Sequence, residues 1–256
     1  MIDHLSVSQI TMFLRCGAQY EFRYLKGIKL PPAGAMIQGT AYHAAIATDL
    51  SHKQDTGELL LDNEIDDIFS TSFDYQIKSK GTQYEDDSEQ FIFEDIDWQG
   101  EEPGKVKDDG IRLAKLYHNT MASKINPIEV EERKEGIVAG IPFVLIADVV
   151  EENKIIDHKL KKKRYSEDEL KKDLQATAYS WIYDKPFEFH QALKLKVPII
   201  EIAQAPRNKS DYLFFQDLVY KVKQAIDTGI FYPNPTTWAC GKLYCGYWQL
   251  CKGSGK

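Results

Sequence analysis

The segment from Ile146 to Tyr183 constrains the fold of this chain more than any other part of its sequence. It begins with an apolar run that predicts a buried strand carrying Asp148. After a polar turn, a short β-branched run predicts a second strand carrying Asp157 and Lys159, and a charged loop and a helix follow. Because strands joined by a tight turn lie side by side, we expect the polar side chains at their ends to lie close together.

These two aspartates and the lysine have the chemistry that metal-assisted phosphodiester hydrolysis needs. A hard divalent cation prefers oxygen ligands, and a nearby ammonium group stabilises the negative charge that grows on a phosphate. A second interpretation stays open from the residues alone. In it, Asp148 and Asp157 are polar residues that face a turn, and Lys159 is a solvated strand end.

Elsewhere the sequence passes from helical to strand periodicity and back. Apolar residues at helical spacing predict helices over 6–26, 35–50, 110–124, 167–183 and 210–228. Alternating and β-branched runs predict strands within 128–150, 154–160 and 190–202. In the first helix, the expected buried stripe is Ile10, Phe13, Leu14, Ala18, Phe22 and Leu25. This order of elements predicts a mixed α/β (α+β) fold, and 256 residues are enough for one large domain or two small ones.

Charge is distributed unevenly along the chain. The total is −7, but residues 49–109 hold 19 acidic and 5 basic residues, so the remainder carries +7 and is basic enough to attract phosphates. We expect the acidic segment to be a helical insertion beside the site. A disordered acidic loop is the alternative, and it fits poorly with the many aromatic residues of the segment, among them Phe69, Phe73, Tyr75, Phe91, Phe93 and Trp98.

Four cysteines lie near the two ends of the chain, at Cys16, Cys240, Cys245 and Cys251. The N-terminal residues show no export signal and no run approaches the roughly 18 apolar residues of a membrane span, so we expect a soluble, cytoplasmic protein without disulfides. Four thiolates are the full ligand set of a zinc site or an iron–sulfur cluster, which would join the two chain ends. Free buried cysteines are the alternative.

Two further patterns place polar side chains on helices. Gln175 and Tyr179 are four residues apart and share one helical face, as do Gly39 and His43 on the helix expected over 35–50. A glycine inside a helix costs about 1 kcal/mol relative to alanine, so it usually has a packing or ligand-approach reason. Each pattern also fits ordinary structural residues, namely a packed tyrosine beside a solvated glutamine, and a histidine satisfied within the fold.

Six short motifs follow one another along the chain: SVSQITMFLRC, GTAYH, IAD, IIDHK, QATAY and the three-cysteine tail. In this order they resemble the motifs of the PD-(D/E)XK nuclease superfamily in its RecB-like branch. The resemblance is closest to the iron–sulfur exonucleases that include the CRISPR-associated four-cysteine nucleases and the AddB nuclease domain. It covers the chain outside the acidic segment. It implies a restriction-endonuclease-like core, with a central mixed sheet flanked by helices, in a single nuclease domain over 1–256.

The resemblance also implies roles for the residues that occupy these motifs. The implied ligands of a Mg²⁺ or Mn²⁺ ion are His43, Asp148, Asp157 and the backbone carbonyl of His158. Lys159 matches the catalytic lysine, Gln175 would support it, and Tyr179 would lie along the DNA path. One departure is Ala147, which stands where the family usually has glycine before the first aspartate.

For the cysteines, the resemblance implies a structural [4Fe-4S] cluster bound by Cys16, Cys240, Cys245 and Cys251. In this arrangement the tail, residues 230–256, packs on the 6–26 helix. The first tail spacing has four intervening residues where two are common in that branch. Zn²⁺ therefore stays an alternative at this site.

The function expected from these observations is that of a divalent-metal-dependent DNA exonuclease acting on single strands or ends, in recombination, repair, phage replication or CRISPR adaptation. The sequence contains no helicase-type phosphate loop, so a helicase, an annealing protein or a CRISPR integrase would be a separate partner. One alternative is a DNA-binding adaptor of nuclease fold with little activity. Another is a zinc-stapled protein whose acidic segment mimics nucleic acid.

Overall fold

A single mixed sheet organises the molecule, which is described by a computed structural model over residues 3–80 and 96–252. Its strands follow the chain order, and neighbours are antiparallel except for the parallel pair β3 and β4. The strands are β1 Glu129–Val138, β2 Ile141–Val150, β3 Ile155–Lys161, β4 Phe187–Leu193 and β5 Ile199–Gln204. A parallel pair needs a crossover, which here consists of α6 Glu167–Lys172 and α7 Leu174–Tyr183.

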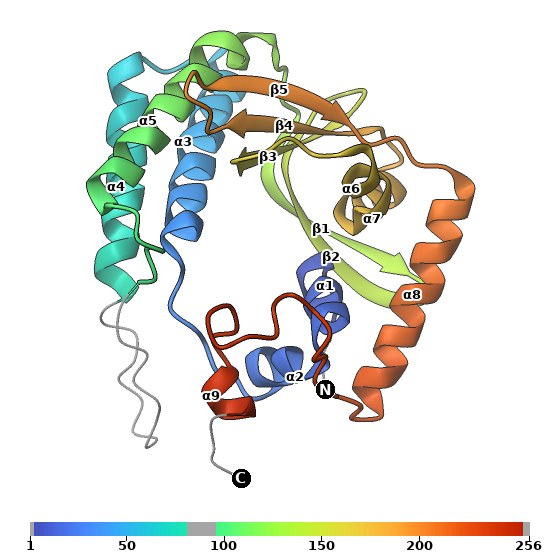
Figure 1. The fold of residues 1–256 in the computed structure, drawn as a ribbon. Helices are drawn as coiled ribbons and strands as arrows, with labels where there is room; N and C mark the ends of the chain where they lie inside the picture. Colours follow the sequence, from blue (N-terminus) through green and yellow to red (C-terminus); the bar gives the residue numbers. More distant parts are fainter. Residues whose placement is uncertain (1–2, 81–95, 253–256) are drawn as a thin grey trace.

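Helices cover both faces of this sheet (Figure 1). One layer contains α3 Gly34–Thr56, α4 Asp62–Lys80 and α5 Pro103–Thr120, and the other contains α1 Val7–Arg15, α7 and α8 Lys209–Asp227. Shorter helices are α2 Gly17–Tyr20, a π-helical turn at Glu21–Leu25, a 3₁₀ turn at Ala122–Lys124 and α9 Trp248–Cys251. The predicted fold class, a mixed α/β fold with helices flanking a mixed sheet, is confirmed.

The sheet separates two apolar cores. The core on the α1, α7 and α8 side includes Phe143, Phe189 and Phe215, and the core on the α3, α4 and α5 side includes Phe69 and Tyr117. Burial of apolar surface against both faces explains why β2 is a nearly continuous apolar run in the sequence. The two helical layers are thereby fixed on opposite sides of β2 and β3.

The helix predicted over 6–26 is not continuous in the structure. At Cys16 the backbone is extended, with φ −167° and ψ 114°, so α1 ends there and α2 begins in a new direction. The single helical stripe is broken as a result: Ile10 and Ala18 are buried, whereas Leu14 and Leu25 are exposed. The break has a local stabilising contact, since the amide of Cys16 still donates to the carbonyl of Met12.

The predicted helix over 167–183 is likewise divided, at Asp173. This residue has extended backbone angles, and its carboxylate accepts a hydrogen bond from the amide of Ala176, which caps α7. Ser166 caps α6 through a reciprocal capping box with Glu169. The second predicted helix is longer than expected, because α3 continues past Leu50 to Thr56.

Much of the acidic segment is helical and packed. Phe69 and Phe73 on α4 lie in the core beside α3 and α5, and Trp98 is partly buried against it, whereas Tyr75 is exposed. Phe91 and Phe93 lie outside the described residues. None of the helices in residues 3–80 and 96–252 is long and apolar enough to cross a membrane.

Candidate active site

Strands β2 and β3 pair for only two residues and then separate, and the two predicted aspartates lie where they part. The register joins Val149 to Ile156 and Val150 to Ile155 and goes no further toward the open end. Beyond this point, the carboxylate of Asp148 accepts a hydrogen bond from the backbone amide of His158 at 2.6 Å. A side chain thus takes the place of the missing strand partner, which fixes Asp148 beside β3.

The alternation of β2 is interrupted at the same place. Ala147 packs into the core below α7, yet Val149 packs into the opposite core and Val150 returns to the first. Across the register, Val130 faces Val149 and Glu132 faces Ala147, so Glu131 lies opposite Asp148. Glu131 has a left-handed backbone with φ 52°, a conformation that costs a non-glycine residue roughly 1–3 kcal/mol and is concentrated at functional sites.

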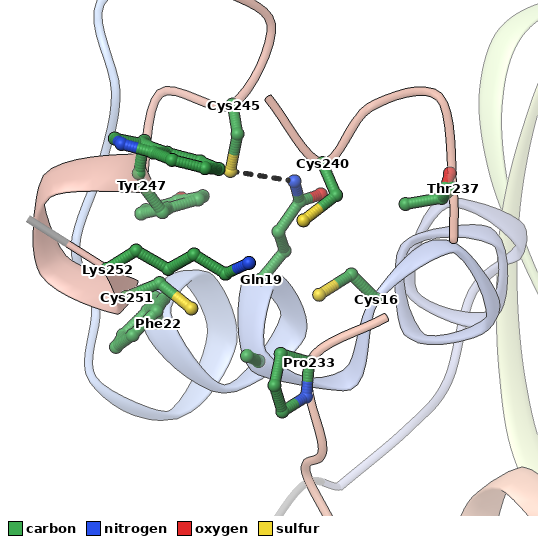
Figure 2. Close-up of a pocket in the computed structure, with 12 residues that line it drawn as sticks. Cys16, Gln19, Phe22, Pro233, Thr237, Cys240, Cys245, Tyr247, Cys251 and Lys252 are labelled. Carbon is green, nitrogen blue, oxygen red and sulfur yellow. Dashed lines mark hydrogen bonds between the residues drawn. The ribbon is translucent and has the colours of Figure 1, made fainter. Parts of the chain in front are cut away.

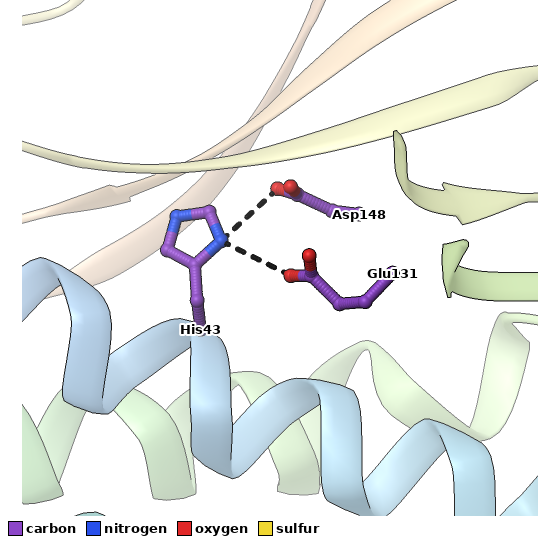
Figure 3. Close-up of side chains that lie close together, drawn as sticks. All are labelled: His43, Glu131 and Asp148. Carbon is purple, nitrogen blue, oxygen red and sulfur yellow. Dashed lines mark ion pairs between the residues drawn. The ribbon is translucent and has the colours of Figure 1, made fainter. Parts of the chain in front are cut away.

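His43 from α3 completes a cluster with these two carboxylates (Figure 3). Its Nδ1 lies 3.3 Å from Asp148 Oδ2 and 3.8 Å from Glu131 Oε1. Burial lowers the pKa of His43, but its interactions with the carboxylates of Asp148 and Glu131 outweigh burial and raise that pKa to about 10. The three ligand atoms lie within 4.8 Å of one another, close enough to share a single cation.

Gly39, one helical turn before His43, has open space where a side chain would begin, because no atom lies within 4 Å of the position of a Cβ. The packing reason expected for this glycine is therefore wrong, and the ligand-approach reason stays a prediction. The helix surface beside His43 is left uncovered at this residue.

Asp157, Lys159 and Gln175 form a second cluster on the α7 side. Lys159 Nζ lies 2.7 Å from Asp157 Oδ2 and donates to Gln175 Oε1 at 3.2 Å, while Gln175 Nε2 donates to Asp157 Oδ1 at 2.5 Å. Burial and the charge of Asp148 raise the pKa of Asp157 to about 7. Burial lowers the pKa of Lys159, but the charge of Asp157 outweighs it, so the lysine remains an ammonium ion.

This donor set fits a hard divalent cation. Asp157 is 2% exposed, and its Oδ2 makes no hydrogen bond within the described part of the chain, with the Lys159 ammonium as its close neighbour. A buried carboxylate oxygen of this kind is satisfied by a cation. Asp148 supplies a second carboxylate. Burial raises the pKa of Asp148, but the hydrogen bond and the charge of His43 outweigh burial and hold that pKa below its ordinary value.

Tyr179 does not lie where the sequence predicts. Its ring is 6% exposed, and its hydroxyl donates to the carbonyl of Ile146 at 2.7 Å and accepts from the Ile146 amide at 3.3 Å. A buried phenol bonded to a backbone cannot lie along a DNA path. Tyr179 instead holds β2 at its open side, one helical turn from Gln175.

Glu131 was missed by the sequence reasoning. It lies within the charged run EVEERKE, and nothing in that run distinguishes Glu131 from a solvated side chain of a strand. The signal that distinguishes it, a left-handed backbone opposite Asp148, exists only after β1 and β2 have paired. The imidazole of His158 was also overlooked, since only its carbonyl was predicted as a ligand. That ring is buried and points toward Tyr117 on α5.

The four cysteines line one pocket between α2 and the C-terminal tail (Figure 2). None of the four forms a disulfide within the described residues. Gln19 Nε2 donates to Cys245 Sγ at 3.2 Å, and burial together with the other cysteines raises the pKa of Cys251. The tail is held there by the hydroxyl of Tyr247, which donates to the carbonyl of Ile28 at 2.9 Å.

Comparison with known proteins agrees with this architecture. The family model of the PD-(D/E)XK nuclease superfamily matches residues 4–252. A solved structure of a proposed exonuclease from Eubacterium rectale has 15% identity to this chain and a TM-score of 0.54, covering 93% of this chain and 87% of that one, which is a likeness of fold.

A second solved structure, of SSO0001, has 11% identity over 88% of this chain and 77% of that one, with a TM-score of 0.39. No curated protein matches the chain. The family predicted from the motifs is confirmed at the level of the superfamily, by a match that spans both carboxylate clusters and the tail. The chain therefore belongs to the PD-(D/E)XK nuclease superfamily.

Proposed function

We propose that this protein is a divalent-metal-dependent DNA exonuclease that acts on single strands or on DNA ends. The observation that supports the proposal is that Asp148, where β2 and β3 separate, accepts from the His158 amide on the strand that carries Asp157 and Lys159. The structural likeness to a protein named as an exonuclease supports the exonuclease assignment.

The candidate ligands of the cation are His43, Glu131, Asp148, Asp157 and the carbonyl of His158. A divalent cation bound there supplies Lewis acidity toward the phosphate and activates water. Lys159 remains an ammonium ion between Asp157 and Gln175. A charged lysine can stabilise the pentacoordinate phosphate, whereas it cannot act as the base that removes a proton from water. Gln175 is hydrogen-bonded to both Asp157 and Lys159, so its proposed role is to orient Lys159.

The test is digestion of DNA labelled at the 5′ or the 3′ end, single- or double-stranded, with Mn²⁺ or Mg²⁺. We expect stepwise products from one end with the wild type. Lys159→Met should lower the cleavage rate by about 100- to 1,000-fold, the cost of removing one preorganised charge-stabilising group. Lys172→Met, which changes an exposed lysine of α6, is the matched control and should cleave normally.

Two outcomes would contradict the proposal. Cleavage by Lys159→Met at the rate of the Lys172→Met control would remove Lys159 from the mechanism. DNA binding without metal-dependent cleavage by the wild type would favour the adaptor function. Because the chain has no helicase-type phosphate loop, we propose that a helicase, an annealing protein or a CRISPR integrase supplies any unwinding or integration.

For the cysteine pocket we propose a structural [4Fe-4S] cluster, as in the RecB-like iron–sulfur exonucleases. The four cysteines that line this pocket are the full ligand set of such a cluster, and they would equally serve a tetrahedral zinc site. Iron, sulfide and zinc analysis of purified protein, with a visible spectrum, separates the two metals.

We also propose one nuclease domain over residues 1–256, in which 49–109 is a helical cover beside the site and 230–256 is a tail packed on 6–26. Two core clusters against one sheet support this unit. We propose a cytoplasmic location, because cysteines that bind a metal centre are typical of reducing compartments.

A further inference from the structure

The polar side chains on one face of β3 continue beyond Lys159. Successive side chains of a strand point to opposite faces, so Lys161 lies on the same face as Asp157 and Lys159, whereas Leu160 packs against the core on the other side. Lys161 Nζ lies 3.1 Å from the ring centroid of Tyr165, which belongs to the loop between β3 and α6. Neither Lys161 nor Tyr165 belongs to the two carboxylate clusters.

Tyr165 is fixed beside Lys159 by contacts from β4. Its ring packs on Phe189 with the two centroids 4.7 Å apart, and Lys159 Nζ lies 5.9 Å from the centroid of the same Phe189 ring. The backbone amide of Tyr165 donates to Gln191 Oε1 at 2.9 Å. Gln191 is the partner of Lys159 in the register of the parallel strands β3 and β4, so these contacts lie next to the candidate active site.

Three hydrogen-bond donors at this place have no acceptor. Within residues 3–80 and 96–252, the Lys161 ammonium, the Tyr165 hydroxyl and Gln191 Nε2 make no hydrogen bond. Lys161 and Tyr165 are partly exposed, whereas Gln191 is 1% exposed, and a buried donor without an acceptor is costly. The arrangement fits an anion with several acceptor oxygens, such as a phosphate.

The acidic side chains around this place have partners of their own. These pairs are Glu169 with the Ser166 amide, Asp173 with the Ala176 amide, Glu201 with Arg164, and Asp157 with Lys159. Lys161 itself forms no ion pair with any residue in the described part of the chain. An anion that comes from outside the chain would therefore meet an uncompensated ammonium group.

The spacing along β3 indicates which phosphate this is. Residues two apart on a strand are about 6.6 Å apart, which is close to the separation of successive phosphates along an extended DNA strand. When Lys159 lies at the scissile phosphate, Lys161 is placed to meet its neighbour.

We propose that Lys161 and Tyr165 bind the phosphate next to the scissile phosphate on the DNA strand that is cut, and that Gln191 positions Tyr165. An ammonium group and a phenol both donate hydrogen bonds to phosphate oxygens. The site rests on the proposed function, because Lys159 places the scissile phosphate. If Lys161 merely covered the Tyr165 ring by packing, the hydroxyl would have no role in binding DNA.

The first experiment measures DNA binding without cleavage. The anisotropy of a fluorescent single-stranded oligonucleotide is followed in EDTA at several salt concentrations. Lys161→Met should weaken binding and reduce the slope of log affinity against log salt by about 0.7, because one phosphate contact is lost. Lys221→Met, at an exposed position of α8, is the matched control and should keep the wild-type slope. Equal slopes for the two variants would overturn the proposal.

The second experiment removes the charge from the DNA instead of the protein. The substrate carries one uncharged methylphosphonate, placed in turn on either side of the linkage that is cut. At one of these two positions, KM of the wild type should rise by about 10- to 100-fold, the usual effect of losing a hydrogen bond to a charged group. Lys161→Met should already have a raised KM on ordinary DNA and should lose little more. A full further loss in this variant would show that Lys161 does not contact that phosphate.

Tyr165→Phe separates phosphate binding from packing. This variant keeps the ring below Lys161 and against Phe189 and removes only the hydroxyl. KM for DNA should rise by about 10-fold while kcat and the melting temperature stay at the wild-type values. Tyr75→Phe, at an exposed position of α4, is the control. An equal KM for the two variants would remove Tyr165 from the site.

Failure of this proposal can be distinguished from failure of the nuclease function. If the wild type cuts no DNA while Lys161→Met still reduces the salt slope, the nuclease function fails and the phosphate contact stands. If the wild type cuts DNA while Lys161→Met and Lys221→Met have equal slopes, the phosphate contact fails alone.

Discussion

At the scale of single residues, the two aspartates have opposite electrostatic environments. Burial raises the pKa of both, but His43 and the His158 amide offset this effect at Asp148. Asp157 faces the charge of Asp148 in addition to burial, and its pKa rises to about 7 despite Lys159. Two neighbouring carboxylates with such different pKa values are typical of active sites in which each carboxylate has a different chemical role.

The pKa of Asp157 predicts how stability depends on pH. The folded state holds this proton more tightly than the unfolded state, so Asp157 contributes stability that is fully present below about pH 4 and lost as the pH rises through about 7. Asp157→Asn should remove this contribution. Unfolding of both metal-free proteins, followed from about pH 4 to about pH 8 and compared as a difference, checks the prediction. A constant difference across this range would contradict it.

Glu131 offers a second residue-scale prediction. Since the carboxylate of Glu131 helps to raise the pKa of His43, Glu131→Gln should lower that pKa. It should also weaken Mn²⁺ binding, because a candidate carboxylate ligand is lost. Titration of the His43 ring by NMR and calorimetry with Mn²⁺ measure the two effects. Glu132→Gln on the same strand is the control, because Glu132 is exposed and belongs to no metal-capable cluster among the described residues. An unchanged His43 pKa in Glu131→Gln would exclude Glu131 from the site.

At the scale of secondary-structure elements, the site depends on how β2 is held after it parts from β3. α7 performs this task through Tyr179, whose hydroxyl bonds both backbone groups of Ile146. The register on the other side is set by β1, where the left-handed residue Glu131 lies opposite Asp148. The sheet therefore opens near Asp148, because β2 and β3 pair over only two residues and because the side of β2 that faces each core changes there.

Loss of the Tyr179 hydroxyl should destabilise this element. Tyr179→Phe leaves the carbonyl and amide of Ile146 without their partner, which should cost about 1–3 kcal/mol in the free energy of unfolding. Denaturant unfolding measures the loss, with Tyr75→Phe on the exposed face of α4 as the control. Equal stability of the two variants would mean that β2 is held without Tyr179.

At the scale of the whole molecule, two proposed metal centres lie in different parts of the fold. The carboxylate site lies between α3 and the strands, whereas the cysteine pocket lies between α2 and the tail (Figures 2 and 3). The cysteines join residues from the two ends of the chain, so a cluster bound there would contribute to folding stability. The two centres should therefore respond independently to loss of metal.

A chelator experiment tests this independence. Brief treatment with EDTA should abolish DNA cleavage while leaving the brown colour, and Mn²⁺ should restore cleavage. Cys245→Ser should give colourless protein with a lower melting temperature, because one thiolate of the pocket is lost. Iron analysis and thermal unfolding follow both effects. Retention of full colour and stability in Cys245→Ser would place any cluster elsewhere.

Local patterns in the sequence determined a large part of this description. Strand and helix periodicity, the motif around Asp157 and Lys159 and the four-residue spacing of Gln175 and Tyr179 are all properties of short segments. They predicted the mixed fold and the superfamily. They failed at Cys16 and Asp173, where tertiary contacts and capping override a helical pattern that continues through the break.

Only the tertiary structure decided which distant residues meet. Glu131 beside His43, the fork between β2 and β3, and the chain from His158 through Tyr117 to His190 join residues on separate elements. Spacing along a helix or strand is set by backbone geometry and can be read locally. The distance between elements depends on how their apolar faces pack and on where the backbone departs from regular alternation, and the sequence of a single segment does not encode either.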